Sequence, residues 1–335
     1  MSAGVQVFLY PEELEHVEPD ALAEQVLGLG CDAVSVAVAY HRGRRVLPRH
    51  RRVSVLTRTT VYLDPDAARY GVLRPEGAAT PALHRFRDAC DRAGLRFRAW
   101  VVGLHNGELA EAHPDAAARL ADGSPAGHSL CPSAPAAVEY VAALAGDVAA
   151  QLQPEAVDLE AAFYPGWEPS YTLTLALEPL SEEEKLLWAQ CACPACLATP
   201  DRADGARRLV EAVADAVHRE GSLLRVFASG PPGQAALQGV SPESVASADA
   251  LLYGCGTLRG DELLARFAAL RGLTGRPGTV STNWTAERTD LAADAEHLAA
   301  AGAEGLALYN LSLVPEAGLE AFREAAAAFR AGAPA

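Results

Sequence analysis

The chain has 335 residues, half of them hydrophobic, and carries 28 Lys and Arg against 43 Asp and Glu, a formal net charge of −15. A surface this acidic repels nucleic-acid phosphates, and we find no cluster of basic and aromatic residues that offsets the repulsion. No apolar run reaches the ~18–20 residues of a membrane-spanning helix. The composition therefore argues against nucleic-acid and membrane partners.

Short apolar runs alternate with Ala- and Leu-periodic segments from end to end, a pattern typical of parallel strands joined by crossover helices. Strands are expected at residues 5–10, 31–40, 95–104, 156–163, 223–228, 250–253, 278–283 and 305–311, and helices at 19–29, 81–94, 134–151, 204–220, 260–270, 290–301 and 318–330. We predict an α/β fold, a single (β/α)8 TIM barrel over residues 1–335. The alternative, an open doubly wound sheet, normally has a Gly-rich phosphate loop after its first strand, and this chain has none there.

Long loops follow the second, third and fourth predicted strands, and the last of them includes a cysteine-containing insertion at residues 165–203. In such barrels the loops that follow strands lie together on the C-terminal face, which carries the active site. The first of these loops contains an arginine-rich segment, residues 41–58, which is either a solvated loop or a clamp for an anionic group of the substrate.

The most specific local feature is a pair of carboxylates, Asp158 and Glu160, in the fourth predicted strand. Charged residues are costly in a parallel strand, and residues at i and i+2 point to the same side. Two like charges this close are expected to raise one pKa, which gives the proton donor and the anion that a glycosidase uses. Alternatively, Asp158 binds water in the barrel interior or an arginine such as Arg225, and Glu160 acts alone.

Further polar and aromatic residues lie at or near the ends of predicted strands, where they would bind sugar hydroxyls and rings. A second catalytic carboxylate is less obvious, because Glu12 and Glu287 lie beyond their strand ends. The single lysine, Lys185, lies in a helix-start pattern, which argues against a lysine-dependent aldolase. The candidate substrate-binding residues are Tyr10, His41, His105, Asn106, Arg225, Tyr253, Asn283, Trp284 and Tyr309.

Three cysteines lie within six residues, Cys191, Cys193 and Cys196, and form a candidate structural zinc site. Such a site needs four ligands, so Cys131 or His128 would have to complete it. The alternatives are a redox pair of Cys193 and Cys196, or cysteines that stabilise the loop by packing alone. No cofactor is expected for the chemistry itself. The start of the chain lacks signal-peptide features and the cysteine count is odd, which predicts reduced thiols and a cytoplasmic location.

Several motifs together resemble a group of bacterial glycoside-hydrolase-like TIM-barrel proteins. They are His113-Pro114, the Ser-Leu-Cys-Pro-Ser stretch at 129–133 before a helix with Tyr140, the Val-Asp-Leu-Glu stretch at 157–160, and Cys-Ala-Cys-Pro-Ala-Cys at 191–196. The match covers residues 95–200. It implies that Glu160 is a catalytic carboxylate with Asp158 as its neighbour. The Asp-x-Glu spacing is also similar to the end of the chitinase signature, whose earlier aspartates this chain lacks.

These observations lead to one main hypothesis and two alternatives. The chain is expected to be a glycosidase that acts on a small glycoside or a sugar-bearing metabolite, with Glu160 as general acid/base. The first alternative is a metal-dependent hydrolase or lyase with His41, His105 and Glu160 as ligands. The second is a sugar-binding barrel without catalysis.

Overall fold

A computed structural model of the chain describes residues 4–166, 180–181, 184, 190–198, 201–288 and 290–333. The predicted insertion at 165–203 is therefore described only in part, and Lys185 lies outside the described residues.

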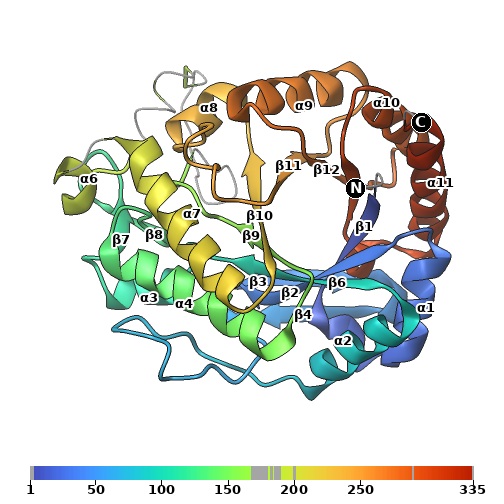
Figure 1. The fold of residues 1–335 in the computed structure, drawn as a ribbon, viewed down its shortest axis with the longest axis horizontal. Coiled ribbons are helices and arrows are strands. Elements are labelled where there is room, and N and C mark those ends of the chain that lie inside the picture. Colours follow the sequence, from blue (N-terminus) through green and yellow to red (C-terminus); the bar gives the residue numbers. More distant parts are fainter. Residues whose placement is uncertain are drawn as a thin grey trace.

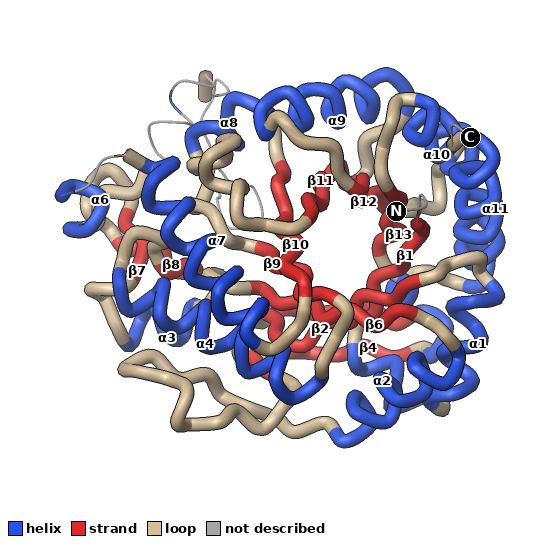
Figure 2. The backbone as a smooth tube through the Cα atoms, in the orientation of Figure 1, coloured by secondary structure: helices blue, strands red, loops and turns tan. Residues whose placement is uncertain are grey.

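Eight parallel strands form a closed barrel surrounded by helices (Figures 1 and 2). The first strand pairs with both the second and the last, Val7 lying opposite Val34 on one side and Leu308 on the other, which closes the ring. The prediction of an α/β (β/α)8 TIM barrel is thus confirmed. The strands are β1 (Gly4–Leu9), β2 (Ala33–Tyr40), β6 (Arg96–Val102), β9 (Ala156–Glu160), β10 (Leu223–Ser229), β11 (Ala250–Gly256), β12 (Thr279–Asn283) and β13 (Gly305–Tyr309).

The seven predicted helices are present around the barrel (Figure 2). Proline opens several of them, where its missing N–H costs nothing, and Gly94 ends one in the left-handed conformation that glycine adopts without strain. A short helix, α8 (Pro232–Leu237), was not predicted, because six residues are too few to show helical periodicity. The predicted helices are α1 (Pro19–Gly28), α2 (Pro81–Ala93), α4 (Pro135–Leu152), α7 (Arg202–Arg219), α9 (Gly260–Thr274), α10 (Leu291–Ala300) and α11 (Glu316–Gly332). No described helix is both long and apolar enough to cross a membrane.

The long loops after the second, third and fourth barrel strands carry small elements of their own. The loop after β2 forms an antiparallel hairpin of β3 (Gly43–Leu47) and β4 (Arg52–Leu56). The loop after β6 contains a second two-stranded sheet, and the loop after β9 contains a short helix beside the cysteines. The remaining elements in the described part of the chain are η1 (Pro11–Glu15), η2 (Pro48–His50), β5 (Thr60–Val61), α3 (Gly107–Ala112), β7 (Ala117–Arg119), β8 (Pro125–Leu130), α6 (Pro194–Ala198) and η3 (Leu311–Leu313).

The barrel interior has a polar layer with an aromatic layer beside it along the strands. Gln6 of β1 accepts hydrogen bonds from Arg98 and, at 2.6 Å, from Arg225. Two residues further along the strand, Phe8 packs against Trp100 with ring centroids 5.0 Å apart and against Phe227 at 5.7 Å. Side chains alternate along a strand, so residues i and i+2 both point into the barrel. The aromatic layer therefore lies nearer than the polar layer to the C-terminal ends of the strands, where the loops meet.

Candidate active site

A cavity of about 470 Å³ opens at the C-terminal ends of the barrel strands. Its volume lies within the range of small-molecule sites, and its wall combines aromatic rings with hydroxyl, amide and imidazole groups. Only one carboxylate, Glu160, is present among the described residues that line it. The lining residues are His41, Trp100, His105, Glu160, Ala161, Phe163, Tyr164, Phe227, Ser229, Gln238, Val240, Gly254, Gly256, Ser281, Asn283 and Tyr309.

Glu160 is the last residue of β9 and is half-buried in the cavity wall. Its Oε2 accepts a hydrogen bond of 2.7 Å from the indole Nε1 of Trp100. The next residue, Ala161, has a φ of 55°, a left-handed conformation that is strained for a residue other than glycine. Strain of this kind is concentrated at functional sites, where the surrounding structure enforces it.

Trp100 holds this carboxylate in place because its own ring cannot move. It is 1% exposed, and its ring centroid lies 4.8 Å from that of Tyr40 and 5.6 Å from that of Tyr10. Phe8 covers it from inside the barrel. A ring packed on several sides has one accessible rotamer, so the direction of its N–H is fixed, and with it the position of the Glu160 carboxylate.

Three tyrosine hydroxyls meet beside Glu160. The hydroxyl of Tyr10 lies 2.6 Å from that of Tyr309 and 3.1 Å from that of Tyr40. Burial, followed by contact with Tyr10, raises the pKa of Tyr309 well above its ordinary value, and the Glu160 charge adds to this. The hydroxyls therefore stay protonated at neutral pH and serve as neutral hydrogen-bond donors. Tyr309 lines the cavity, whereas Tyr10 supports it from behind.

Two histidines line the cavity next to these tyrosines, and the His41 ring stacks on that of Tyr40 with centroids 4.5 Å apart. His41 and His105 have ring centroids 6.0 Å apart, and His128 lies 5.4 Å behind His105. Burial, assisted by the two neighbouring histidines, lowers the pKa of His105 to about 3, and burial also lowers the pKa of His41. Both rings are therefore neutral at pH 7. The Nδ1 of His41 donates to the Arg42 carbonyl at 2.8 Å, which leaves its Nε2 as an acceptor for a substrate hydroxyl.

Asp158 lies in the polar layer of the barrel and does not line the cavity. It is 0% exposed, accepts a 2.7 Å hydrogen bond from Ser35, and forms an ion pair of 3.3 Å with Arg225. Arg225, expected to bind substrate, is itself buried against Asp158 and Gln6. The alternative prediction, that Asp158 binds an arginine inside the barrel, describes this arrangement. The two carboxylates share a side of the strand, but only Glu160 reaches the cavity.

Replacing Asp158 with Ala is expected to destabilise the protein by about 3–5 kcal/mol, because it leaves the buried Arg225 guanidinium without its counter-charge. Urea unfolding followed by circular dichroism measures the change. Asp115→Ala, at an exposed position, is the matched control and should stay within about 0.5 kcal/mol. A loss below about 1 kcal/mol for Asp158→Ala would show that Arg225 does not depend on this charge.

Tyr253, predicted to bind substrate, points away from the cavity. Its hydroxyl lies 2.5 Å from the Thr274 hydroxyl and donates a 2.7 Å hydrogen bond to the carbonyl of Arg276, at the end of α9. The adjacent residue Gly254 occupies the inward position and lines the cavity instead. β11 continues to Gly256, so Tyr253 is not its end, and the strand alternation turns the ring toward the helix layer.

Asn106 and Trp284, also predicted to bind substrate, make contacts within the fold instead. The side chain of Asn106 caps α3 by accepting a 3.0 Å hydrogen bond from the Leu109 N–H, and it donates to the Tyr140 hydroxyl at 3.3 Å. Trp284 packs beside Gly318 at the start of α11. Neither residue lines the cavity, which leaves His41, His105, Asn283 and Tyr309 as the predicted binding residues that do.

The two candidates for a second carboxylate lie elsewhere. Glu12 is buried in an ion pair with Arg45, and accepts a 3.0 Å hydrogen bond from Ser54. Glu287 is exposed and lines a separate outer cavity with Arg259. Among the residues that the structure describes, neither faces Glu160 across the cavity.

Several lining residues were missed from the sequence. Ser281 lies two residues before Asn283 on β12, so strand alternation could have found it. Tyr164 and Gln238 follow β9 and α8 in irregular segments, and Tyr164 N–H donates to the Gln238 carbonyl at 3.0 Å. Their convergence depends on the path of two loops, for which the sequence carries no periodic signal.

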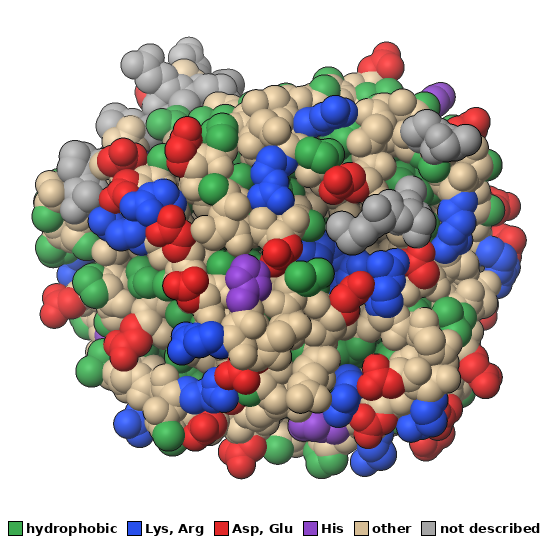
Figure 3. All heavy atoms as spheres, in the orientation of Figure 1, with side chains coloured by type: hydrophobic (Ala, Val, Ile, Leu, Met, Phe, Trp, Pro, Cys, Tyr) green, Lys and Arg blue, Asp and Glu red, His purple; other side chains and the backbone are tan. Residues whose placement is uncertain are grey.

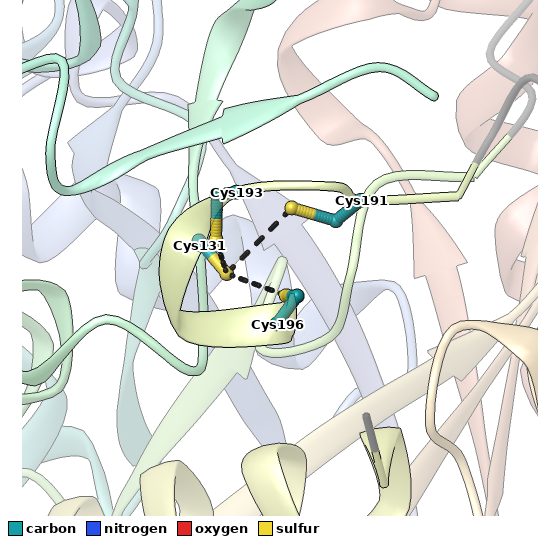
Figure 4. Close-up of side chains that lie close together, drawn as sticks. All are labelled: Cys131, Cys191, Cys193 and Cys196. Carbon is teal, nitrogen blue, oxygen red and sulfur yellow. Dashed lines mark hydrogen bonds between the residues drawn. The ribbon is translucent and has the colours of Figure 1, made fainter. Parts of the chain in front are cut away.

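The cysteine cluster is completed by Cys131 (Figure 4). The sulfur atom of Cys131 lies 3.4 Å from those of Cys193 and Cys196 and 3.8 Å from that of Cys191. All four thiols are buried and unbridged, and their sulfurs lie within 4.8 Å of one another. Tetrahedral zinc with sulfur ligands at about 2.3 Å brings sulfurs to about 3.8 Å apart, so the group has the dimensions of a structural metal site.

Backbone contacts hold the sulfurs and connect them to the cavity wall. The N–H groups of Arg119 and Ser133 each point at a cluster sulfur at 3.4 Å. The Ser133 hydroxyl also bonds to that of Tyr164, which lines the cavity. His128, the other proposed fourth ligand, lies beside His105 instead. A metal bound by the cysteines would therefore brace one side of the candidate active site.

The cysteines are the only group of three or more Cys, His, Asp or Glu side chains in the described part of the chain that is close enough to share a metal ion. His41, His105 and Glu160, the ligand set of the metal-dependent alternative, do not form such a group there.

No protein-family model matches the chain, and no curated protein matches it in sequence. Among solved structures it is similar to an α-L-fucosidase isoenzyme 2 from Paenibacillus thiaminolyticus, with a TM-score of 0.61 and 15% identity over 97% of this chain and 49% of that one. It thus spans about half the length of the fucosidase. The catalytic domain of a β-amylase from Paenibacillus polymyxa matches with a TM-score of 0.60 and 11% identity, over 97% of this chain and 98% of that one. The C-terminal domain of a putative chitinase from Desulfitobacterium hafniense matches with a TM-score of 0.56 and 8% identity, over 98% of this chain and 100% of that one. The predicted resemblance to glycoside-hydrolase-like TIM barrels is confirmed for the fold.

Proposed function

We propose that this barrel is a glycosidase acting on a small glycoside, with Glu160 as its general acid/base. The observation that carries the proposal is the position of Glu160. It ends a barrel strand, it is held by a buried indole N–H, and it is the one carboxylate among the described residues of an aromatic-lined cavity. The fold shared with a fucosidase, a β-amylase and a putative chitinase supports the same class of reaction, although a fold alone does not name one.

In this proposal the carboxylic acid of Glu160 gives its proton to the glycosidic oxygen while the bond from that oxygen to the anomeric carbon breaks. The Glu160 carboxylate then takes a proton from the water that adds to the anomeric carbon, which restores the acid. The Tyr309 and Phe227 rings offer apolar faces to the sugar, and neutral His105 and Asn283 bind its hydroxyls. Trp100 keeps the carboxylate aimed at the cavity throughout.

The test is a panel of 4-nitrophenyl α- and β-glycosides of common hexoses, pentoses and deoxysugars. We expect at least one to release nitrophenolate at a rate proportional to enzyme concentration, with the free sugar as second product. Proton NMR of its anomeric hydrogen during the first turnovers then distinguishes retention from inversion. Tight binding of a glycoside with no product by mass spectrometry would instead identify a sugar-binding barrel.

We also propose that Cys131, Cys191, Cys193 and Cys196 hold a structural zinc ion. Four thiolates with no room for a further ligand are typical of closed structural sites, whereas catalytic zinc keeps one position open. When bound, the metal would cross-link the segment that follows β8 to the segment that leads into α6, and it would supply no reaction chemistry. Buried, unbridged thiols also fit a reducing compartment, and we propose the cytoplasm as the place of action.

A further inference from the structure

The hairpin of β3 and β4 presents an apolar face to solvent. Strand pairing places Val46 opposite Val53 and Arg44 opposite Val55, so these four side chains share its outer face. The three valines, which we call the valine face, are 59%, 56% and 61% exposed. Single exposed valines are unremarkable, but three on one small sheet form a patch of the kind that marks interaction sites.

The inner face of the same hairpin is fixed to the barrel by buried charges. Arg45 forms an ion pair with Glu12 and lies over the Tyr10 ring, 3.9 Å from its centroid. In the turn, Arg49 and His50 both pair with Glu13, which is 0% exposed. The hairpin is thus held in one position, and a partner would meet a preformed surface and pay little ordering entropy.

The charge around the valine face is opposite to that of the rest of the molecule. Seven of the 28 basic residues and none of the 43 acidic ones lie in residues 41–58, which leaves the remainder of the chain with a net charge of −22. Exposed arginines border the valines, with Arg44 on β3 and Arg52 on β4. On the face of the molecule seen in Figure 3, acidic side chains are interspersed with basic ones.

We propose that the valine face binds a second copy of this chain, and that it contacts an acidic surface of that copy. Every copy supplies both halves of such a contact, an apolar basic hairpin and an acidic body, at equal concentration. Two hairpins meeting by their outer faces would bring the Arg44 side chains of both copies into one interface, where like charges repel, so the contact joins unlike surfaces. Two reciprocal contacts or a ring close such an assembly. This inference does not depend on the proposed reaction.

The test is the oligomeric state of the full chain, measured by sedimentation velocity over a series of micromolar concentrations. We expect the wild type to form a dimer or a closed higher oligomer that weakens as salt is raised. Val53→Asp and Val55→Asp should each weaken it at least about 30-fold, since a charge in the centre of an interface costs as much as a hot-spot residue. Val72→Asp, at a valine outside the hairpin that is 69% exposed, is the control and should leave association unchanged.

Two results would overturn the proposal. One is a wild type that stays monomeric throughout the series. The other is an oligomer that survives Val53→Asp and Val55→Asp with unchanged affinity while circular dichroism confirms that both variants are folded. The face would then be a solvated surface or the contact for another partner.

Discussion

Glu160→Gln is expected to lower kcat on the glycosides that the wild type cleaves by about a hundredfold to ten-thousandfold, the range of a lost general acid/base. Glutamine has the shape of glutamate and can still accept the hydrogen bond from Trp100, so the cavity should keep its geometry. What the variant lacks is the transferable proton. The deficit should therefore depend on the leaving group, being smaller for 4-nitrophenol, which departs readily as an anion, and larger for an alkyl glycoside. Comparing kcat for the two substrates measures this.

The matched control is Glu287→Gln, which removes an exposed carboxylate near the same face of the barrel, outside the cavity. We expect its kcat to stay within about twofold of the wild type, because nothing in the structure brings this side chain to Glu160. Equal losses for alkyl and nitrophenyl glycosides in Glu160→Gln would show that the residue binds substrate without donating a proton. A loss of kcat in Glu287→Gln but not in Glu160→Gln would show that the reaction takes place in the outer cavity.

The strands could be predicted because both of their faces are buried, which leaves runs of Val, Ala and Leu that stand out from the helical segments. β2, for instance, is buried at all eight positions. Its predicted start was two residues early because Cys31 is as buried as the strand, although its N–H still bonds to the Val26 carbonyl of α1. The helix α8 is too short to produce a recognisable sequence pattern. The structure of the long loops depends on contacts between segments far apart in the sequence, which no local pattern encodes.

The candidate site was predicted in part by one rule, that functional residues lie at the C-terminal ends of barrel strands. The rule located Glu160, Asn283 and Tyr309 in the cavity wall. It failed for Tyr253, because the true end of β11 lies three residues further on. For Asp158 the side of the strand was predicted correctly. Its depth in the barrel, however, decides which residues it contacts. That depth depends on how β9 is aligned with its neighbouring strands, which no local sequence pattern shows.

Removing the proposed zinc is expected to destabilise the protein about as much as Asp158→Ala does. A purified sample should contain about one zinc per chain, and Cys193→Ser should lose it, because three ligands cannot complete a closed tetrahedral site. Zinc present at about a thousand times its Kd contributes about 4 kcal/mol of stability. For a chain of 335 residues this corresponds to about 6 °C in the midpoint of thermal unfolding. Elemental analysis and calorimetry of the same samples measure the two quantities together.

Cys90→Ser is the matched control, since Cys90 is a buried free thiol on α2, far from the cluster in sequence and outside the four-sulfur group. It should keep its zinc, which would separate metal loss from the general cost of burying a hydroxyl. Because Ser133 links the cluster to Tyr164 in the cavity wall, metal loss should also raise KM more than it lowers kcat. Full zinc content in Cys193→Ser, or none in the wild type, would exclude the site. A metal-free variant with unchanged KM would show instead that the cluster stabilises the loops without bracing the cavity.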